Sequence, residues 1–165
     1  MFKIKLLILL LLSFISLSCT KDRTNNNGVS YSLGYVSGEY DGLILKNLLR
    51  NNLSNLGLYD ETSIFRIESS ISHSSGIFIT NIDNTSDRMR IDSEIIIKII
   101  NQRFNCVSQR FEESVSQYYI FADSDKYISN NKAEKKIKEE NTETLVRNFI
   151  NKVKKPKAIC KNINE

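Results

Sequence analysis

The chain has 165 residues and a formal net charge of +4, and 41% of its residues are hydrophobic. This length fits one domain and argues against a multidomain enzyme. The near balance of basic and acidic residues does not fit a nucleic-acid binder, which needs a clearly basic surface. One histidine and three cysteines leave few residues for a metal or acid–base site.

The first 18 residues are typical of a lipoprotein signal peptide. Two lysines precede an apolar run over residues 6–17, which is shorter than the roughly 20 residues of a transmembrane helix. Cys19 follows a small residue at the cleavage distance, as in a bacterial lipobox. We expect Cys19 to become the first mature residue and to carry a diacylglycerol and palmitate anchor. The alternative is an ordinary signal peptide with an incidental cysteine. Thr20 lacks the carboxylate of an inner-membrane retention signal, so we expect the outer membrane, facing the periplasm.

Polar segments flank the expected domain, which spans residues 29–153. Residues 19–28 have no hydrophobic periodicity, so we expect the lipidated cysteine to be followed by a flexible tether. Residues 154–165 are predicted to form a basic, disordered tail. The oxidising periplasm would permit a disulfide between Cys106 and Cys160, but we favour two unrelated thiols.

The domain is predicted to open with a strand and a helix. Residues 29–36 alternate between apolar and small polar side chains, which places Tyr31 and Tyr35 on one face of a half-buried strand. From about residue 40 to 56 the leucines fall three and four positions apart, which predicts a helix with one apolar stripe.

Three further strands are expected to form an antiparallel meander. The first covers residues 64–73 and could continue over 77–82 past a bend at Gly76. A turn at residues 83–87 leads into the longest alternating run, residues 89–99. The last strand covers residues 107–119, with Phe111, Val115 and Tyr119 facing inward.

The last element is predicted to be a long helix that ends before Pro156. We expect it to begin near Asn131, whose side chain can cap the helix while Glu134 answers three residues later. Its apolar stripe includes Ile137 and Phe149, which should pack against the sheet.

The element order β-α-β-β-β-α predicts an α+β fold. We expect a two-layer sandwich, with two helices on one face of a four-stranded mixed sheet. The opposite face should be polar and mixed in charge, carrying Arg66, Glu68, Arg90, Asp92, Lys98, Arg110 and Glu112. Ile96 and Ile100 are apolar exceptions on that face, explained either by a partner surface or by a covering loop.

A catalytic site is not expected. His73 is the only histidine, and it falls on the inward side of its strand, where a structural role is favoured over a general base. Glu112 and Glu113 are adjacent in a strand and point to opposite faces, so they do not form an acid–base pair. No nucleophile motif or phosphate loop is present in the sequence. We therefore expect no enzyme activity, no cofactor and no metal site.

Three segments of the expected domain carry a resemblance to a known family. They are LKNLLRNNLSNLG at residues 45–57, the SDR sequence at 86–88 before the alternating apolar run, and Tyr127 in SDKYISNNKAEKK, before a helix ending in LVRNFINKV. Together with a lipobox and a polar tether, they resemble the LPS-assembly lipoprotein family LptE, in its alphaproteobacterial branch. The resemblance covers about residues 29–153.

The resemblance implies a non-catalytic outer-membrane lipoprotein. Members of the family sit inside the lumen of the LPS-translocon β-barrel, LptD, assist its assembly, and take part in LPS insertion. Because LPS phosphates are anionic, basic residues on a sheet face are the candidate contacts. We select Arg88, Arg90, Lys98 and Arg110, for which an ordinary solvated position is the alternative.

A second class of protein shares the same anchor, tether and sandwich. It comprises periplasmic accessory lipoproteins of other transport or barrel-assembly complexes, which do not bind LPS. A plug inside a polar lumen should carry mixed charge over most of its surface, whereas an edge-binding accessory protein should show one concentrated patch. The sequence also leaves open whether the loop at residues 37–42 or the turn at 83–87 faces the membrane.

Overall fold

The structure is a computed structural model that describes residues 29–79, 87–120 and 127–153. The expected signal peptide, the tether with Cys19, and the basic tail lie outside the described residues. The elements in chain order are β1 (Ser32–Ser37), α2 (Glu39–Asn55), β2 (Phe65–Ile79), β3 (Asp87–Asn101), β4 (Cys106–Ile120) and α3 (Tyr127–Lys152).

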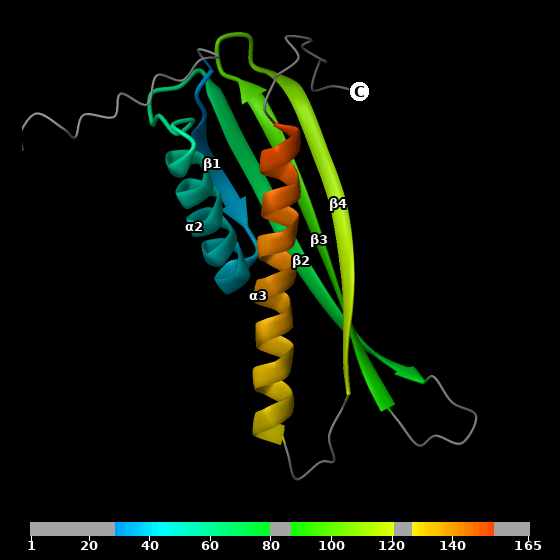
Figure 1. Cartoon of the computed structure of the whole chain (residues 1–165). Coiled ribbons are helices and arrows are strands. Elements are labelled where there is room, and N and C mark those ends of the chain that lie inside the picture. The colour runs from blue at the N-terminus through cyan, green and yellow to red at the C-terminus, as the bar shows by residue number, and fades with distance from the viewer. Residues whose placement is uncertain (1–28, 80–86, 121–126, 154–165) are drawn as a thin grey trace, which may run out of the picture.

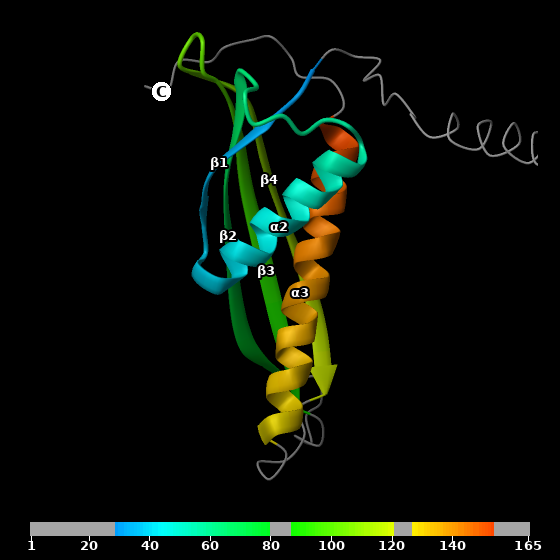
Figure 2. The same cartoon turned by 90° about the vertical axis from the view of Figure 1, so that its left-hand side faces the viewer.

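The four strands form one mixed sheet in the order β1-β2-β3-β4. β1 runs parallel to β2, while β2, β3 and β4 form an antiparallel meander. Both helices lie on the same face of this sheet, as Figures 1 and 2 show from two directions. The α+β two-layer sandwich and its element order are therefore confirmed.

Burial of one stripe from each helix holds the two layers together. Leu45, Leu49 and Leu53 of α2 are fully buried, and α3 contributes Leu145 and Phe149 to the same core. These side chains meet a row of isoleucines on the inward face of the sheet: Ile67, Ile71, Ile95, Ile97 and Ile99. Alternate strand residues point to the other sheet face, and neither α2 nor α3 covers that face (Figure 2).

Tyr31 connects the two ends of the domain. Its hydroxyl donates a hydrogen bond to the carbonyl oxygen of Val153 at 3.1 Å, just after α3 ends. Burial raises the pKa of Tyr31 to about 12, so the hydroxyl keeps its proton and remains a donor. This hydrogen bond thus joins the beginning of the domain to its end, where the chain enters and leaves the sandwich.

The first strand differs from the sequence prediction in its outer half. Tyr35 is 73% exposed rather than on the face of Tyr31. The pairing register of β1 shifts between Leu33 and Val36, and this irregularity reverses the faces of the residues that follow it. Val36 therefore packs against the core in place of Tyr35.

Two element boundaries also differ from the predictions. β2 runs without interruption from Phe65 to Ile79, and pairing continues through Gly76 opposite Arg90, so no bend divides the strand. The predicted turn at 83–87 falls outside the described residues apart from its last position. α3 begins at Tyr127, so the prediction that Asn131 caps the helix is wrong.

Cys106 is disulfide-bonded in the structure. The expectation of a free, unrelated thiol at this position is therefore wrong. Cys106 opens β4 opposite Asn101 of β3, at the turn where the two strands meet. Both other cysteines of the chain, Cys19 and Cys160, lie outside the described residues.

Candidate functional site

The sheet face that the helices leave uncovered has the polar, mixed-charge character predicted from the sequence. Each of its three long strands carries one Arg–carboxylate pair at i and i+2. The N···O distances are 3.0 Å for Arg66–Glu68, 2.8 Å for Arg90–Asp92 and 2.7 Å for Arg110–Glu112. We call this surface the open face. Its pairs are solvent-exposed, so each contributes little to stability.

Asp92 is the most heavily bonded carboxylate on the open face. It accepts a hydrogen bond from the hydroxyl of Ser116 on β4, and its two oxygens share the single N–H of Arg90 Nε, at 2.9 Å from Oδ1 and 2.8 Å from Oδ2. The Ser116 hydroxyl, together with the Arg90 guanidinium, lowers the pKa of Asp92. The Asp92 carboxylate is therefore ionised at neutral pH, and both of its oxygens already accept hydrogen bonds.

The four predicted contact residues all lie on the open face, but the structure separates them into two basic pairs. Arg88 and Arg90 are two residues apart on β3, while Lys98 lies directly opposite Arg110 of β4. Eight residues separate Arg90 from Lys98, which corresponds to about 26 Å along the strand. The four residues therefore form two separate basic pairs on the open face.

The two cations of each basic pair differ in whether they form an ion pair within the domain. Arg90 and Arg110 are bound to Asp92 and Glu112. Within the described part of the chain, no carboxylate lies within ion-pair distance of Arg88 or Lys98. One cation in each pair is therefore available to an anionic partner without first breaking an internal ion pair.

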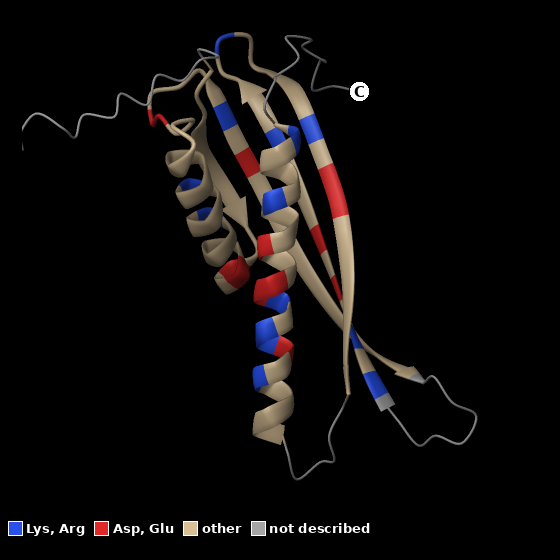
Figure 3. Ribbon diagram, in the orientation of Figure 1, with Lys and Arg blue, Asp and Glu red and all other residues tan. Residues whose placement is uncertain are grey.

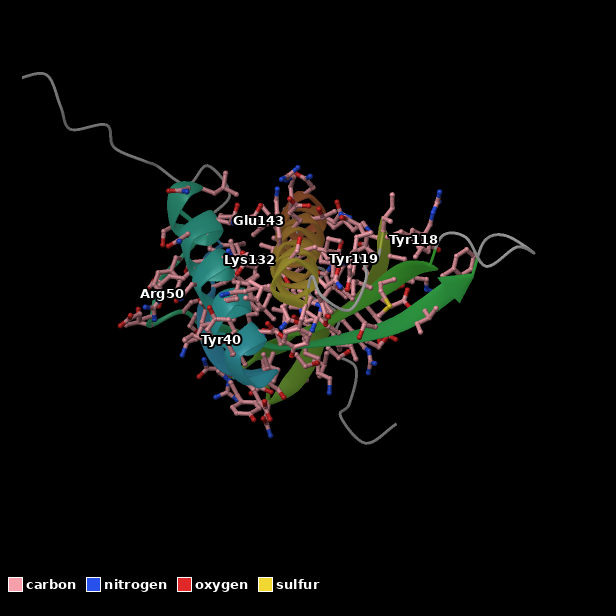
Figure 4. All side chains as sticks on the ribbon, turned by 90° about the horizontal axis from the view of Figure 1, so that it is seen from below. Tyr40, Arg50, Tyr118, Tyr119, Lys132 and Glu143 are labelled. Atoms are coloured by element: carbon pink, nitrogen blue, oxygen red, sulfur yellow. The ribbon has the colours of Figure 1, made fainter. Side chains whose placement is uncertain are left out.

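An apolar tip, which the sequence reasoning missed, lies at the far end of the sheet. Its exposed members are Ile77, Phe78, Tyr118 and Ile120. The rings of Phe78 and Tyr118 lie 5.4 Å apart between centroids. The ends of β2 and β3 twist away from α3 (Figure 1), and a view from below shows Tyr119 toward α3 and Tyr118 away from it (Figure 4). The signal in the sequence was an aromatic or aliphatic residue at the end of the polar faces of β2 and β4.

His73 takes part in a buried polar network between the layers. Its Nδ1 lies 2.7 Å from the Ser93 hydroxyl, which also accepts a hydrogen bond from Nδ2 of Asn141 on α3 at 2.9 Å. Asp41 of α2 faces Nε2 at 3.8 Å. Burial lowers the pKa of His73, while the nearby Asp41 carboxylate opposes that effect.

This network is structural in its geometry. The arrangement of Asp41, His73 and Ser93 places an acid, a base and a hydroxyl in sequence, but Ser93 is only 1% exposed, so a substrate cannot reach its oxygen. Among residues 29–79, 87–120 and 127–153, no group of three or more His, Cys, Asp or Glu side chains is placed to hold a metal ion. None of the described helices is long and apolar enough to cross a bilayer.

Comparisons with known proteins identify the fold. No family model and no curated protein matches the chain. Three solved structures are similar to it. Lipoprotein B from Nitrosomonas europaea has a TM-score of 0.59 and 12% sequence identity, and the match covers 76% of this chain and 82% of that one. The minor lipoprotein from Acinetobacter baumannii has a TM-score of 0.55 and 10% identity, with 76% of this chain and 91% of that one covered. Rare lipoprotein B from Shewanella oneidensis has a TM-score of 0.52 and 11% identity, with 75% of this chain and 96% of that one covered. The chain thus has a fold found in bacterial lipoproteins, and at these identities the similarity concerns the fold alone.

Proposed function

We propose that this chain is an outer-membrane lipoprotein, anchored through Cys19, that plugs the lumen of the LPS-translocon β-barrel and assists its assembly. One observation carries the proposal: both signs of charge are spread along the whole open face and are largely paired within it. A barrel lumen is polar, so a plug needs a surface of this kind.

The helical layer has the same character as the open face. Lys138 pairs with Glu134 at 2.7 Å, and Lys136 lies 3.7 Å from Glu140 on the outer side of α3. Figure 3 shows blue and red segments interspersed along α3 and on the strands. Mixed charge on both layers favours a surface enclosed by a polar wall over one that binds through a single charged edge.

LPS is the cargo of this proposed complex, and the two basic pairs are its contact points. Phosphates accept charge-assisted hydrogen bonds from arginine and lysine. Arg88 and Lys98 can make these bonds directly, whereas Arg90 and Arg110 would have to exchange an internal carboxylate for the phosphate. The spacing of about 26 Å between Arg90 and Lys98 suits an extended, multiply charged ligand better than a single phosphate.

Affinity purification of the tagged full-length protein from detergent-solubilised membranes tests the barrel partner. We expect one large β-barrel protein to be recovered in near-equal amount, as identified by mass spectrometry. A Cys19→Ala variant should leave the membrane fraction while the domain still folds. Recovery of an inner-membrane transporter, or of no partner, would contradict the proposal.

A second experiment tests the basic contacts. Binding of purified LPS to the full-length protein in detergent should weaken by about two- to fivefold for Lys98→Ala, as for a single exposed charge. Lys132→Ala is the matched control, because Lys132 is an exposed lysine on the opposite layer (Figure 4). Equal affinities for both variants would remove Lys98 from the contact.

The apolar tip favours a second candidate function. Phe78, Tyr118 and Ile120 are exposed at one end of the open face, on either side of Arg88, and form the concentrated patch expected of an accessory lipoprotein that binds another complex and no LPS. The same purification separates the two functions. A non-barrel partner that is lost when Phe78 is replaced by Ser would support the accessory role.

A further inference from the structure

A hollow of about 340 Å³ lies in the middle of the open face, between the two basic pairs. Two neighbouring cross-strand rows each place a carboxylate of β3 between two serines. The rows are Ser72–Glu94–Ser114 and Ser74–Asp92–Ser116. Serine side chains are short, so the sheet surface is lower here, and Asp92 and the exposed Glu94 line the hollow.

The two rows differ in their free hydrogen-bonding capacity. Asp92 is already occupied by Arg90 and Ser116. Glu94, Ser72 and Ser114 are exposed, and none of them has a hydrogen-bond or ion-pair partner in the described part of the chain. The hollow therefore offers one free carboxylate and at least two free hydroxyls, which can both donate and accept.

The hollow is open toward the aromatic pair of the apolar tip. The next row along the sheet is Gly76–Arg90–Tyr118, and no atom lies within 4 Å of the position that a Cβ on Gly76 would take. A bound molecule can therefore reach from Glu94 toward Tyr118 and Phe78. Their rings are 48% and 42% exposed and offer flat apolar faces.

The chemistry of the hollow excludes several classes of ligand. A divalent cation needs more oxygen ligands of negative charge than Glu94 alone supplies, because Arg90 already neutralises Asp92. Arg90 and Asp92 neutralise each other in the lining, so Glu94 leaves the hollow with a net negative charge, which disfavours an anion. A purely apolar ligand would cover the free carboxylate and hydroxyls without pairing them, at the cost of their desolvation.

We propose that this hollow binds a neutral saccharide. Two neighbouring sugar hydroxyls donate to the carboxylate of Glu94, and Ser72 and Ser114 supply the complementary donors and acceptors. The Tyr118 ring covers the C–H face of the adjoining sugar unit. This site adds a ligand contact that the basic pairs do not provide, and it does not depend on the barrel partner.

A glycan array tests the proposal with the full-length protein in detergent micelles. The probes are lipid-free neutral oligosaccharides. We expect at least one of them to bind, and Glu94→Ala to weaken its affinity by about tenfold or more, as for loss of a hydrogen-bonded charge. Glu143→Ala is the matched control, because Glu143 is an exposed glutamate on α3 (Figure 4), and it should not change the affinity.

A second variant tests the shape of the hollow rather than its charge. Ser72→Leu should fill the space beside Glu94 and abolish binding, while circular dichroism shows an unchanged fold because residue 72 is exposed. Absence of binding to every neutral probe would overturn the proposal, as would unchanged affinity in both variants. Either result would leave the barrel purification unaffected, so failure of this site and failure of the proposed function are distinguishable.

Discussion

Truncation of Phe149 to Ala should remove a large part of the free energy of unfolding. Phe149 is 1% exposed, so the substitution loses nearly the whole transfer free energy of the ring and leaves a cavity between α3 and the sheet. It also removes an edge-to-face contact with Phe111, whose ring centroid lies 5.5 Å away. Buried Phe→Ala substitutions cost about 3–5 kcal/mol, and the lost ring contact favours the upper half of that range, about 4–5 kcal/mol.

Urea denaturation followed by circular dichroism measures this loss on the mature chain. A loss of about 4 kcal/mol would be a large fraction of a typical domain stability of about 5–15 kcal/mol. Phe104→Ala is the matched control. Phe104 is 65% exposed, and its ring has a cation–π contact with its neighbour Arg103, so its loss should stay below about 1 kcal/mol. Equal losses for the two variants would refute the placement of α3 on the sheet.

Three further predictions concern stability. Burial lowers the pKa of His73 below its ordinary value of 6.5, so the unfolded chain binds the proton more tightly. The free energy of unfolding should therefore fall as the pH drops through 6.5, and His73→Gln should flatten this slope in urea titrations between about pH 7.5 and about pH 5. Gly38→Ala should destabilise by about 1–3 kcal/mol in urea denaturation, because Gly38 has φ +123° and its Cβ would lie 2.7 Å from the carbonyl oxygen of Ile71. Cys106→Ser should lower the stability by about 2–4 kcal/mol under oxidising conditions and have no comparable effect in the presence of a thiol reductant.

The residue pattern was sufficient to predict the inward and outward faces of the long strands. Outside the register shift at Ile99 and Ile100, side chains alternate along β2, β3 and β4. The polar face, the inward position of His73 and the opposite directions of Glu112 and Glu113 therefore follow from the two-residue period of a strand. The helical stripes follow in the same way from spacings of three and four. These features depend only on local sequence and on the need to bury one face.

Features that depend on pairing between strands could not be predicted. The register shift that exposes Tyr35 depends on how β1 fits β2, and no local pattern marks it. The hollow around Glu94 exists because serines from β2 and β4 fall opposite the same residue of β3. A single-residue change of register would have broken these rows. The early start of α3 was missed because residues 127–130 carry no apolar stripe.

The length of the central strands sets the distance between the end where the chain enters the domain and the apolar tip. β2, β3 and β4 each have 15 residues, or about 50 Å at about 3.3 Å per residue. The chain enters the domain at one end of this axis, and the apolar tip lies at the other (Figure 1). The hydrocarbon core of a bilayer is about 30 Å thick, and the whole bilayer is about 40–45 Å thick.

In the proposed complex, the length of the strands therefore fixes how far the apolar tip reaches across the membrane. If it stands upright in the barrel with its entry end at the inner leaflet, Phe78 and Tyr118 lie at the level of the outer-leaflet headgroups. Removing two residues from each of the three strands would shorten this reach by about 7 Å. Such a variant would keep its core and its anchor, but its tip would end near the middle of the outer leaflet.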